Sequence, residues 1–327
     1  MRLLVETMTI FSDLTRNEDR YKRLSIISIN SLTFDHFDSF DVHGMSGSVD
    51  VFYGVNKSGK TTLMEVISWI IASPPCSQKS NYIFHNYSLF ECSLAFTVFN
   101  LPSIIWVNAY TVDETLRAPR HLLDTPFRTH MKLSDGLAFQ DENGCFIDDY
   151  DELPSYFYVA FKQNNVLNVE QLSSFSIFKE LNAAKKPSHK ENIEFLVSES
   201  LQLLRDVCPP TNQFGKIVHS VKNTEQLDQA LKARGENNLI LINFTYQLLG
   251  LINRCKAKNI RLPIIIDDLP QTLSDDYLRL MAKVMKKASR ICQIIATTAD
   301  STVAKVLDEN KINIIKMEAC TPSGFDS

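Results

Sequence analysis

The sequence predicts an α/β fold that combines a parallel β-sheet with a separate antiparallel β subdomain. A strand-like run at 48–53 leads directly into a cluster of glycines and then into a helical apolar pattern at 61–72. From Asn238 onward, apolar strands alternate with helices, which is typical of a parallel sheet covered on both faces. Between residues 88 and 146 the apolar period changes to two, which indicates antiparallel hairpins.

Composition and charge limit the classes of function. The chain is 44% apolar and 22% charged, as expected of a globular protein. Its length of 327 residues is enough for about two domains. Because 34 Lys and Arg face 38 Asp and Glu, the net charge of −4 excludes a global basic field for wrapping nucleic acid. The seven cysteines form no C-x-x-C motif, which favours reduced thiols. The N-terminus lacks an apolar signal region and the run at 66–72 is too short for a membrane span, so we expect a cytoplasmic protein with no membrane partner.

The expected elements follow in chain order from these patterns. Before the glycines we expect strands at 24–29, within 34–42 and at 48–53. After them we expect the helix at 61–72 and hairpin strands at 90–98 and 104–107. The basic, proline-containing stretch at 182–192 is expected to be a linker. The later part predicts helices at 194–207, 239–254, 277–288 and 302–310, and strands at 262–266, 291–296 and 312–317.

The glycine cluster carries the strongest chemical signal. Residues 54–61 read Gly-Val-Asn-Lys-Ser-Gly-Lys-Thr and satisfy the P-loop pattern G-x-x-x-x-G-K-S/T between a strand and a helix. In that context backbone N–H groups and the helix N-terminus face phosphate oxygens, so we predict a P-loop NTPase that binds ATP and Mg²⁺. Lys60 is expected to neutralise the β- and γ-phosphates, and Thr61 to hold Mg²⁺. The predicted nucleotide-binding residues are Gly54, Asn56, Lys57, Ser58, Gly59, Lys60, Thr61 and Thr62.

Two carboxylates end the apolar strand at 262–266. Since ligands bind at the carboxyl ends of parallel strands, Asp267 and Asp268 are expected beside the phosphates. We predict that Asp267 binds Mg²⁺, directly or through water. Asp268, one residue further on, is predicted to be the general base that orients water at the γ-phosphate.

These motifs resemble the SMC-like ABC ATPases, the group that includes the RecF, SbcC, OLD and YhaN-type proteins. The segments ISINSLTFDHFDSFDV and VDVFYGVNKSGKTTLMEVI resemble the start of such a head, and Asn56 fits the family's usual asparagine. LSDGLAFQDENGCFIDDYDELPSYF, LPIIIDDLPQTLSDDY and QIIATTADSTV continue the likeness, which covers 24–172 and 225–318. In that family a glutamate usually stands at the position of Asp268.

The resemblance implies an ABC-type ATPase head with an antiparallel β subdomain. It divides the chain into an N-terminal extension at 1–23, a lobe with the P-loop and β subdomain at 24–172, a short helical insertion at 173–229, and a second lobe at 230–327. The insertion replaces the family's long coiled coil. If it formed an antiparallel pair of arms of about 20 residues each, they would reach about 30 Å.

Further residues take roles only through the resemblance. Gln163 corresponds to the Q-loop glutamine that senses Mg²⁺ and water, and Asp275 corresponds to the D-loop. The family's signature motif contacts the nucleotide of a second head, and only its Gly235 and Glu236 are retained in this sequence. Ala233 replaces the signature serine. Ala299 replaces the switch histidine, which Asp300 could replace only in part because a carboxylate repels the γ-phosphate.

The implied function is an ATPase that forms a homodimer on ATP, with slow hydrolysis separating the heads. It is expected to control a partner effector protein, a nuclease or toxin, that acts on DNA in repair or antiviral defence. The alternative is a nucleotide-binding scaffold with little turnover, which Ala233 and Ala299 favour. A small-molecule phosphotransferase is less consistent, because no arginine-rich lid follows the P-loop.

Overall fold

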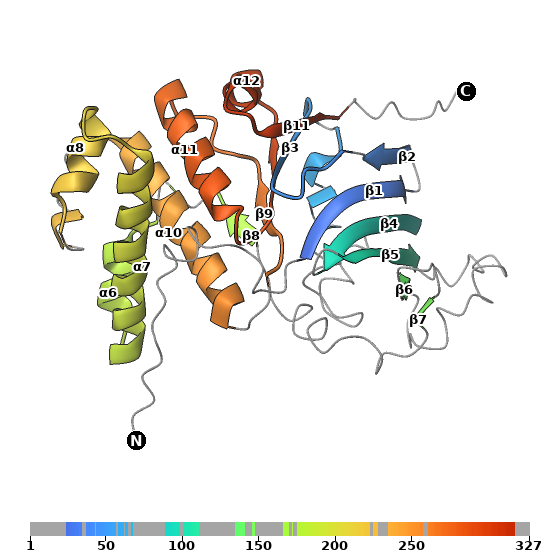
Figure 1. Ribbon diagram of the computed structural model, residues 1–327, viewed down its shortest axis with the longest axis horizontal. Helices are drawn as coiled ribbons and strands as arrows, with labels where there is room; N and C mark the ends of the chain where they lie inside the picture. The colour runs from blue at the N-terminus through green and yellow to red at the C-terminus, as the bar shows by residue number, and fades with distance from the viewer. Residues whose placement is uncertain are drawn as a thin grey trace.

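Two β-sheets organise the chain in the computed structural model (Figure 1). The five-stranded sheet has the order β11-β3-β10-β9-β8, and every pair within it is parallel. Its strands are β3 (Val49–Tyr53), β8 (Val166–Asn168), β9 (Ile264–Asp267), β10 (Ile294–Thr298) and β11 (Asn313–Lys316). The structure describes residues 24–34, 37–42, 44–56, 58–61, 63–64, 67, 89–98, 101–110, 135–140, 146–147, 166–169, 172, 175–222, 225–227, 235–257 and 261–317.

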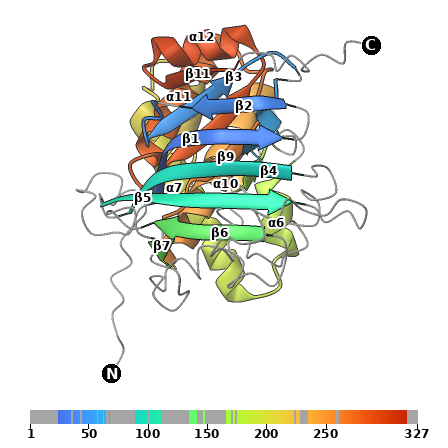
Figure 2. The same cartoon turned by 90° about the vertical axis from the view of Figure 1, so that its right-hand side faces the viewer.

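The second sheet is antiparallel, has six strands and faces the viewer in Figure 2. Its order is β2-β1-β4-β5-β6-β7. The strands are β1 (Leu24–Phe34), β2 (Phe37–Val42), β4 (Leu89–Val98), β5 (Leu101–Tyr110), β6 (Asp135–Gln140) and β7 (Phe146–Ile147). Strands β4 to β7 form the β subdomain that the period-two pattern predicted, and β1 and β2 extend the same sheet. The predicted α/β fold class with a separate antiparallel sheet is confirmed.

Helices cover the parallel sheet on the side away from the antiparallel sheet (Figure 1). Helix α10 packs against α7 and α11, and α12 packs against β3, β10 and β11. Within the described ranges, none of the helices has the length and apolar character that a membrane span requires. The helices are α6 (Ile177–Ala183), α7 (Pro187–Val207), α8 (Gln213–Ser220), α10 (Glu236–Ala257), α11 (Asp275–Ala288) and α12 (Ser301–Glu309).

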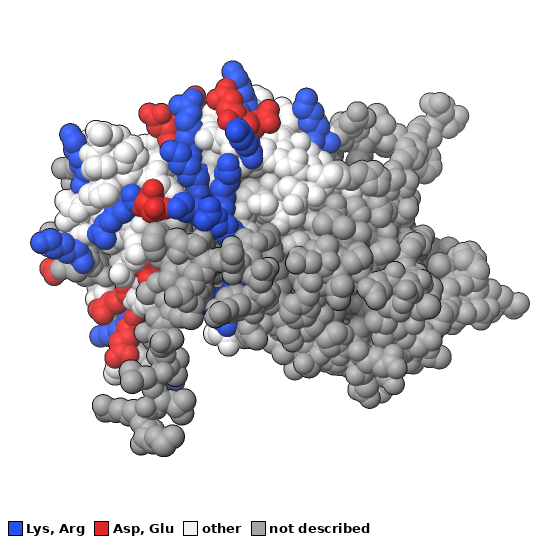
Figure 3. Space-filling view, viewed as in Figure 1, with Lys and Arg blue, Asp and Glu red and all other residues white. Residues whose placement is uncertain are grey.

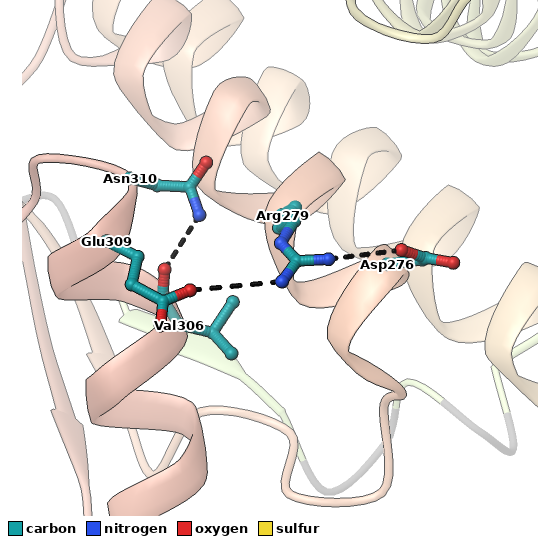
Figure 4. Close-up of polar contacts among 5 residues, drawn as sticks. All are labelled: Asp276, Arg279, Val306, Glu309 and Asn310. Atoms are coloured by element: carbon teal, nitrogen blue, oxygen red, sulfur yellow. Dashed lines mark hydrogen bonds and ion pairs between the residues drawn. The ribbon is translucent and has the colours of Figure 1, made fainter.

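An exposed ion pair and a buried apolar seam join α11 to α12. Arg279 on α11 donates to Asp276 at 3.3 Å and lies 3.8 Å from the Glu309 carboxylate on α12 (Figure 4). Such exposed pairs contribute little, typically less than about 1 kcal/mol. The buried side chains Met281 and Val306, which belong to α11 and α12, show where the main stabilisation of these two helices lies.

The insertion differs from its expected form. Helix α7 begins at Pro187, in the middle of the predicted linker, because proline is well suited to the first turn of a helix. Its apolar face, which includes Leu196 and Leu204, is buried, and α7 packs along α10 and α11. Two paired arms of about 20 residues do not form among the described residues of the insertion, because the helix that follows α7 has 8 residues and also packs on α7.

One buried carboxamide connects the two sheets. Gln293, just before β10, donates from Nε2 to the Ile26 carbonyl at 2.7 Å and to Asp50 Oδ2 at 3.0 Å. Its Oε1 accepts from the Ile26 N–H at 2.6 Å. Asp50 Oδ1 also accepts from the Ser46 N–H at 2.6 Å and from Asn313 Nδ2 at 2.7 Å. These bonds fix the start of β1 against the start of β10 in a region without access to water.

Replacing this carboxamide should destabilise the whole fold. In Gln293→Met the buried N–H and C=O of Ile26 and one oxygen of Asp50 lose their partner, and each unsatisfied group costs about 1–3 kcal/mol. We expect the free energy of unfolding in urea to fall by about 2–5 kcal/mol. Gln202→Met on the exposed face of α7 is the control and should change it by less than about 0.5 kcal/mol. Equal urea midpoints for the two variants would contradict the proposed link between the sheets.

Candidate functional site

The carboxyl ends of three neighbouring strands meet at one edge of the parallel sheet. Strand β10 lies between β3 and β9, with Thr298 opposite Tyr53 and Ala296 opposite Ile266. The loop that follows β3 and the acids that end β9 therefore emerge on either side of the end of β10. The structure thus brings together the P-loop and the acidic strand, as the sequence predicted.

Two glycines of the P-loop are required for different physical reasons. A Cβ on Gly54 would lie 2.5 Å from Ser58 Oγ and 2.9 Å from the Met317 carbonyl oxygen, so no larger side chain fits there. Gly59 has open space around it but a φ of +82°, a conformation that favours glycine. Helical backbone begins at Lys60, directly after this turn. The loop therefore leads directly into a helix N-terminus, where backbone N–H groups can bind phosphate.

The Lys60 ammonium lies within the curve of this loop. Its Nζ donates to the carbonyl oxygens of Gly54 at 2.7 Å and Val55 at 2.8 Å, and to Ser58 Oγ at 3.4 Å. All three acceptors are neutral. Burial lowers the pKa of Lys60 below its ordinary value, and the negative charges of Asp268 and Asp267 oppose this shift. The acids of β9 are thus close enough to the P-loop lysine to act on its charge.

The two acids are held by a residue that sequence reasoning missed. Asp267 Oδ1 accepts a hydrogen bond from Thr297 Oγ1 at 2.8 Å, and the Asp268 N–H donates to the same hydroxyl at 2.7 Å. The available signal was a pair of threonines, Thr297 and Thr298, at the end of the strand IIATT, and the structure buries both.

The carboxylate of Asp268 has a different partner from that of Asp267. Asp268 has a φ of +55°, which is uncommon outside glycine although aspartate tolerates it. Gln271 Nε2 donates to both oxygens of Asp268, at 3.2 and 3.1 Å. The side chain is exposed, so it can reach solvent and a bound ligand.

The other predicted site residues fall into two groups. Gly235, Glu236 and Asp275 are exposed at the first turns of α10 and α11. Within the described part of the chain, none of these three joins the hydrogen bonds around Lys60 and Asp267. Asn56 and Thr61 are exposed within the P-loop. The remaining predicted residues lie outside the described residues, so their roles stay predictions: Lys57, Thr62 and Gln163, together with the departure at Ala233.

The first turns of α10 and α11 are joined to each other. The Tyr277 hydroxyl donates to Asn238 Oδ1, and Asn238 is buried two residues after Glu236. Gly235 has a φ of +100°, and a Cβ built there would meet no heavy atom within 4 Å. This glycine is therefore required by its backbone conformation, and open space lies in front of it.

The suggested substitute for the switch histidine, Asp300, has a structural role in this fold. Asp300 Oδ1 accepts from the N–H groups of Thr302 at 2.6 Å and Val303 at 3.1 Å, which makes it the N-cap of α12. A carboxylate at a helix N-terminus satisfies backbone donors and interacts favourably with the helix dipole. One carboxylate oxygen of Asp300 is thus occupied by the first turn of α12.

The oxygen ligands at the sheet edge suit Mg²⁺. Asp267 offers a carboxylate and Thr61 an exposed hydroxyl, both hard ligands. Among the described residues, no group of three His, Cys, Asp or Glu side chains could hold a metal by itself. Mg²⁺ is usually held by one or two carboxylates together with substrate phosphates, so this donor set fits an ion that arrives with a nucleotide.

Comparison with known proteins adds similarity of fold. No protein-family model matches the sequence, and no curated protein matches it. The SMC head domain from Thermotoga maritima is 14% identical with a TM-score of 0.47, covering 87% of this chain and 92% of that one. A Pyrococcus furiosus Smc head domain with an extended coiled coil, bound to the C-terminal domain of ScpA, is 14% identical with a TM-score of 0.49, covering 91% and 95%.

A nucleotide-free ATP-binding cassette from an ABC transporter is also similar, at 12% identity and a TM-score of 0.39, covering 93% of this chain and 90% of that one. At these identities the likeness concerns the fold, and the site is characterised by this chain's own residues.

The role of Asp300 as a helix cap leads to a test. Removing an N-cap side chain costs about 1 kcal/mol, so we expect Asp300→Ala to lower thermal stability by that amount. ATP affinity should not change, because the carboxylate is directed at α12. Asp308→Ala, on the exposed face of the same helix, is the matched control and should change neither quantity. Altered ATP affinity in Asp300→Ala at unchanged stability would restore the switch role.

Proposed function

We propose that this chain binds ATP with Mg²⁺ and hydrolyses it, in the manner of SMC-like ABC ATPase heads. The observation that carries the proposal is the meeting of the P-loop with two acids at one sheet edge. Asp267 and Asp268 act on the charge of Lys60, although 207 residues separate Lys60 from Asp267 along the chain. A chance glycine-rich turn would not explain this second, distant feature.

Each residue has a role that fits its surroundings. The P-loop N–H groups and Lys60 bind the phosphates, and Lys60 exchanges carbonyl acceptors for phosphate oxygens. Thr61 and Asp267 hold Mg²⁺, which neutralises phosphate charge when bound. Asp268 orients the attacking water as general base, and its exposed carboxylate suits this role. Because aspartate is shorter than the family's usual glutamate, we expect a water molecule to bridge Asp268 and the attacking water.

Residues that the structure does not describe complete the proposed site. Lys57 and Thr62 belong to the P-loop motif, and Thr62 is proposed to bind on the α-phosphate side. Gln163 is proposed to sense the metal and water, as the family's Q-loop glutamine does. These assignments rest on the sequence motif and the resemblance.

The proposed active assembly is a homodimer that encloses ATP. Three exposed residues, Gly235, Glu236 and Asp275, take no part in the hydrogen bonds around Lys60 and Asp267. Within a single head they therefore do not contribute to the nucleotide site. Open space in front of Gly235 and the dipole of α10 suit the phosphates of a second head. Ala233 removes the usual serine hydroxyl, so we expect a weak dimer that a partner protein reinforces.

We further propose that the ATPase controls a nuclease or toxin acting on DNA, in repair or antiviral defence, in the cytoplasm. The support is the resemblance to SMC-like ATPases together with one surface feature. Lys and Arg side chains gather over α11, with acids among them (Figure 3). With a net charge of −4, DNA contact requires a local surface of this kind. The basic side chains of α11 are Arg279, Lys283, Lys286 and Lys287.

A scaffold that binds ATP with little turnover is the second candidate. Ala299 supplies no imidazole at the switch position, and the neighbouring Asp300 is committed to capping α12. These two observations favour slow hydrolysis. Measured turnover relative to Lys60→Ala distinguishes an ATPase from the scaffold.

Lys60→Ala should abolish ATP binding. The substitution removes the P-loop lysine that is proposed to neutralise the β- and γ-phosphates, so we expect calorimetry to detect no Mg·ATP binding while thermal unfolding remains cooperative. Lys305→Ala, on the exposed face of α12, is the charge-matched control and should bind like the wild type. A Lys60→Ala dissociation constant equal to the wild-type value would refute the P-loop assignment.

Asp268→Asn should bind ATP but fail to hydrolyse it. Loss of a general base lowers turnover by about 100- to 10,000-fold, so ATP should persist and the dimer should accumulate. Phosphate release and light scattering with Mg·ATP measure the two effects, with Asp308→Asn as the matched control. Wild-type turnover in Asp268→Asn would exclude this residue as the base. A strictly monomeric mass, with ATP bound, would reject the nucleotide-enclosing dimer and favour the scaffold.

A further inference from the structure

The Thr297 side chain lies at the centre of the sheet edge that carries the candidate site. It belongs to β10, between the strand of the P-loop and the strand of the acids, and is 0% exposed. A buried hydroxyl needs hydrogen-bond partners, and both partners of Thr297 belong to the pair Asp267 and Asp268. The Thr297 carbonyl also accepts from the Leu269 N–H at 2.8 Å. Three successive residues of the acidic turn are therefore attached to this one residue.

The direction of these hydrogen bonds is determined by chemistry. The Asp268 backbone N–H can only donate, so the Thr297 hydroxyl is its acceptor. The hydroxyl has one proton of its own, which it donates to Asp267 Oδ1. Asp267 is therefore held as an acceptor with one oxygen fixed, while its other oxygen keeps its capacity to bind a ligand.

The same hydroxyl supports the unusual backbone of Asp268. A φ of +55° is a strained conformation for a residue with a Cβ, and it persists only where neighbouring contacts hold it. The bond from the Asp268 N–H to Thr297 is one such contact. The neighbouring Thr298 differs, because its hydroxyl accepts from the Asp300 N–H instead.

We infer that Thr297 is a positioning residue for the candidate metal acid. By holding the Asp267 carboxylate and the Asp268 amide together, its hydroxyl sets how well Asp267 takes Mg²⁺ along with ATP. Thr297 itself touches neither the metal nor the nucleotide. The inference rests on the proposed ATPase function and adds a residue that the P-loop and acid motifs do not include.

The test separates Mg²⁺-dependent from Mg²⁺-independent binding. ATP affinity is measured by calorimetry with Mg²⁺ and with a chelator, for the wild type, Thr297→Val and Thr297→Ser. Thr297→Val keeps the shape and loses the hydroxyl, and such losses weaken metal binding by about 10- to 100-fold. We expect the Mg²⁺ concentration for half-maximal ATP binding to rise by that factor. Affinity in the chelator should stay unchanged, and Thr297→Ser should restore the wild-type value.

Thr245→Val is the matched control for the loss of a buried hydroxyl. Thr245 is equally buried and bonds to the Leu241 carbonyl within α10, so its loss should alter stability without changing Mg²⁺ dependence. If Thr297→Val does not fold, Thr297→Cys, which keeps a weak donor, should give an intermediate Mg²⁺ dependence.

The outcomes are distinguishable. Unchanged Mg²⁺ dependence in Thr297→Val, or in Thr297→Cys if Val does not fold, overturns the inference and leaves the proposed ATPase standing. Equal loss of affinity with and without Mg²⁺, or no rescue by Thr297→Ser, shows a structural role and also overturns it. Absence of ATP binding by the wild-type protein defeats the proposed function, and the inference with it.

Discussion

The structure depends on one constraint: polar atoms buried around strand β10 must find partners within the protein. β10 lies between β3 and β9, and polar residues stand at both of its ends. At its start, Gln293 bonds to Ile26 and Asp50 and joins the antiparallel sheet to the parallel one. At its end, Thr297 bonds to the two acids of β9. In this low-dielectric interior an unmade bond is expensive, so both contacts restrict the geometry strongly.

Because of this constraint, the P-loop and the acids of the candidate site are attached to the same strand end. The Gly54 N–H donates to the Thr298 carbonyl at 3.3 Å, so the P-loop is attached to the same strand end as the acids. The groups that contact a bound nucleotide must be held in the right positions relative to one another, because the nucleotide contacts them together. A lysine from one side of β10 and an acid from the other are thereby attached to the same strand end.

Much of the fold was predictable because its signals are local. The glycines at 54–59, the apolar run at 262–266 and the period-two alternation each specify backbone structure within a few residues. The role of Thr297 was not predictable, because it depends on which strand lies beside β9. The N-cap role of Asp300 has a local signal in the sequence, because aspartate directly before a helix is a typical N-cap. The apolar face of α7 could not reveal whether another arm or the lobe itself would cover it.

The first turns of α10 and α11, which are proposed to contact a second head, are also attached to each other. Tyr277, two residues after Asp275, bonds to Asn238, two residues after Glu236. The first turns of α10 and α11 are thus one unit, and a contact that shifts one turn must shift the other. Because Ala233 removes a direct hydroxyl contact, affinity for a second head would depend on several weak contacts formed together. A rigid link lowers the entropy lost when such contacts form, so in the proposed dimer this bond would partly offset the missing hydroxyl.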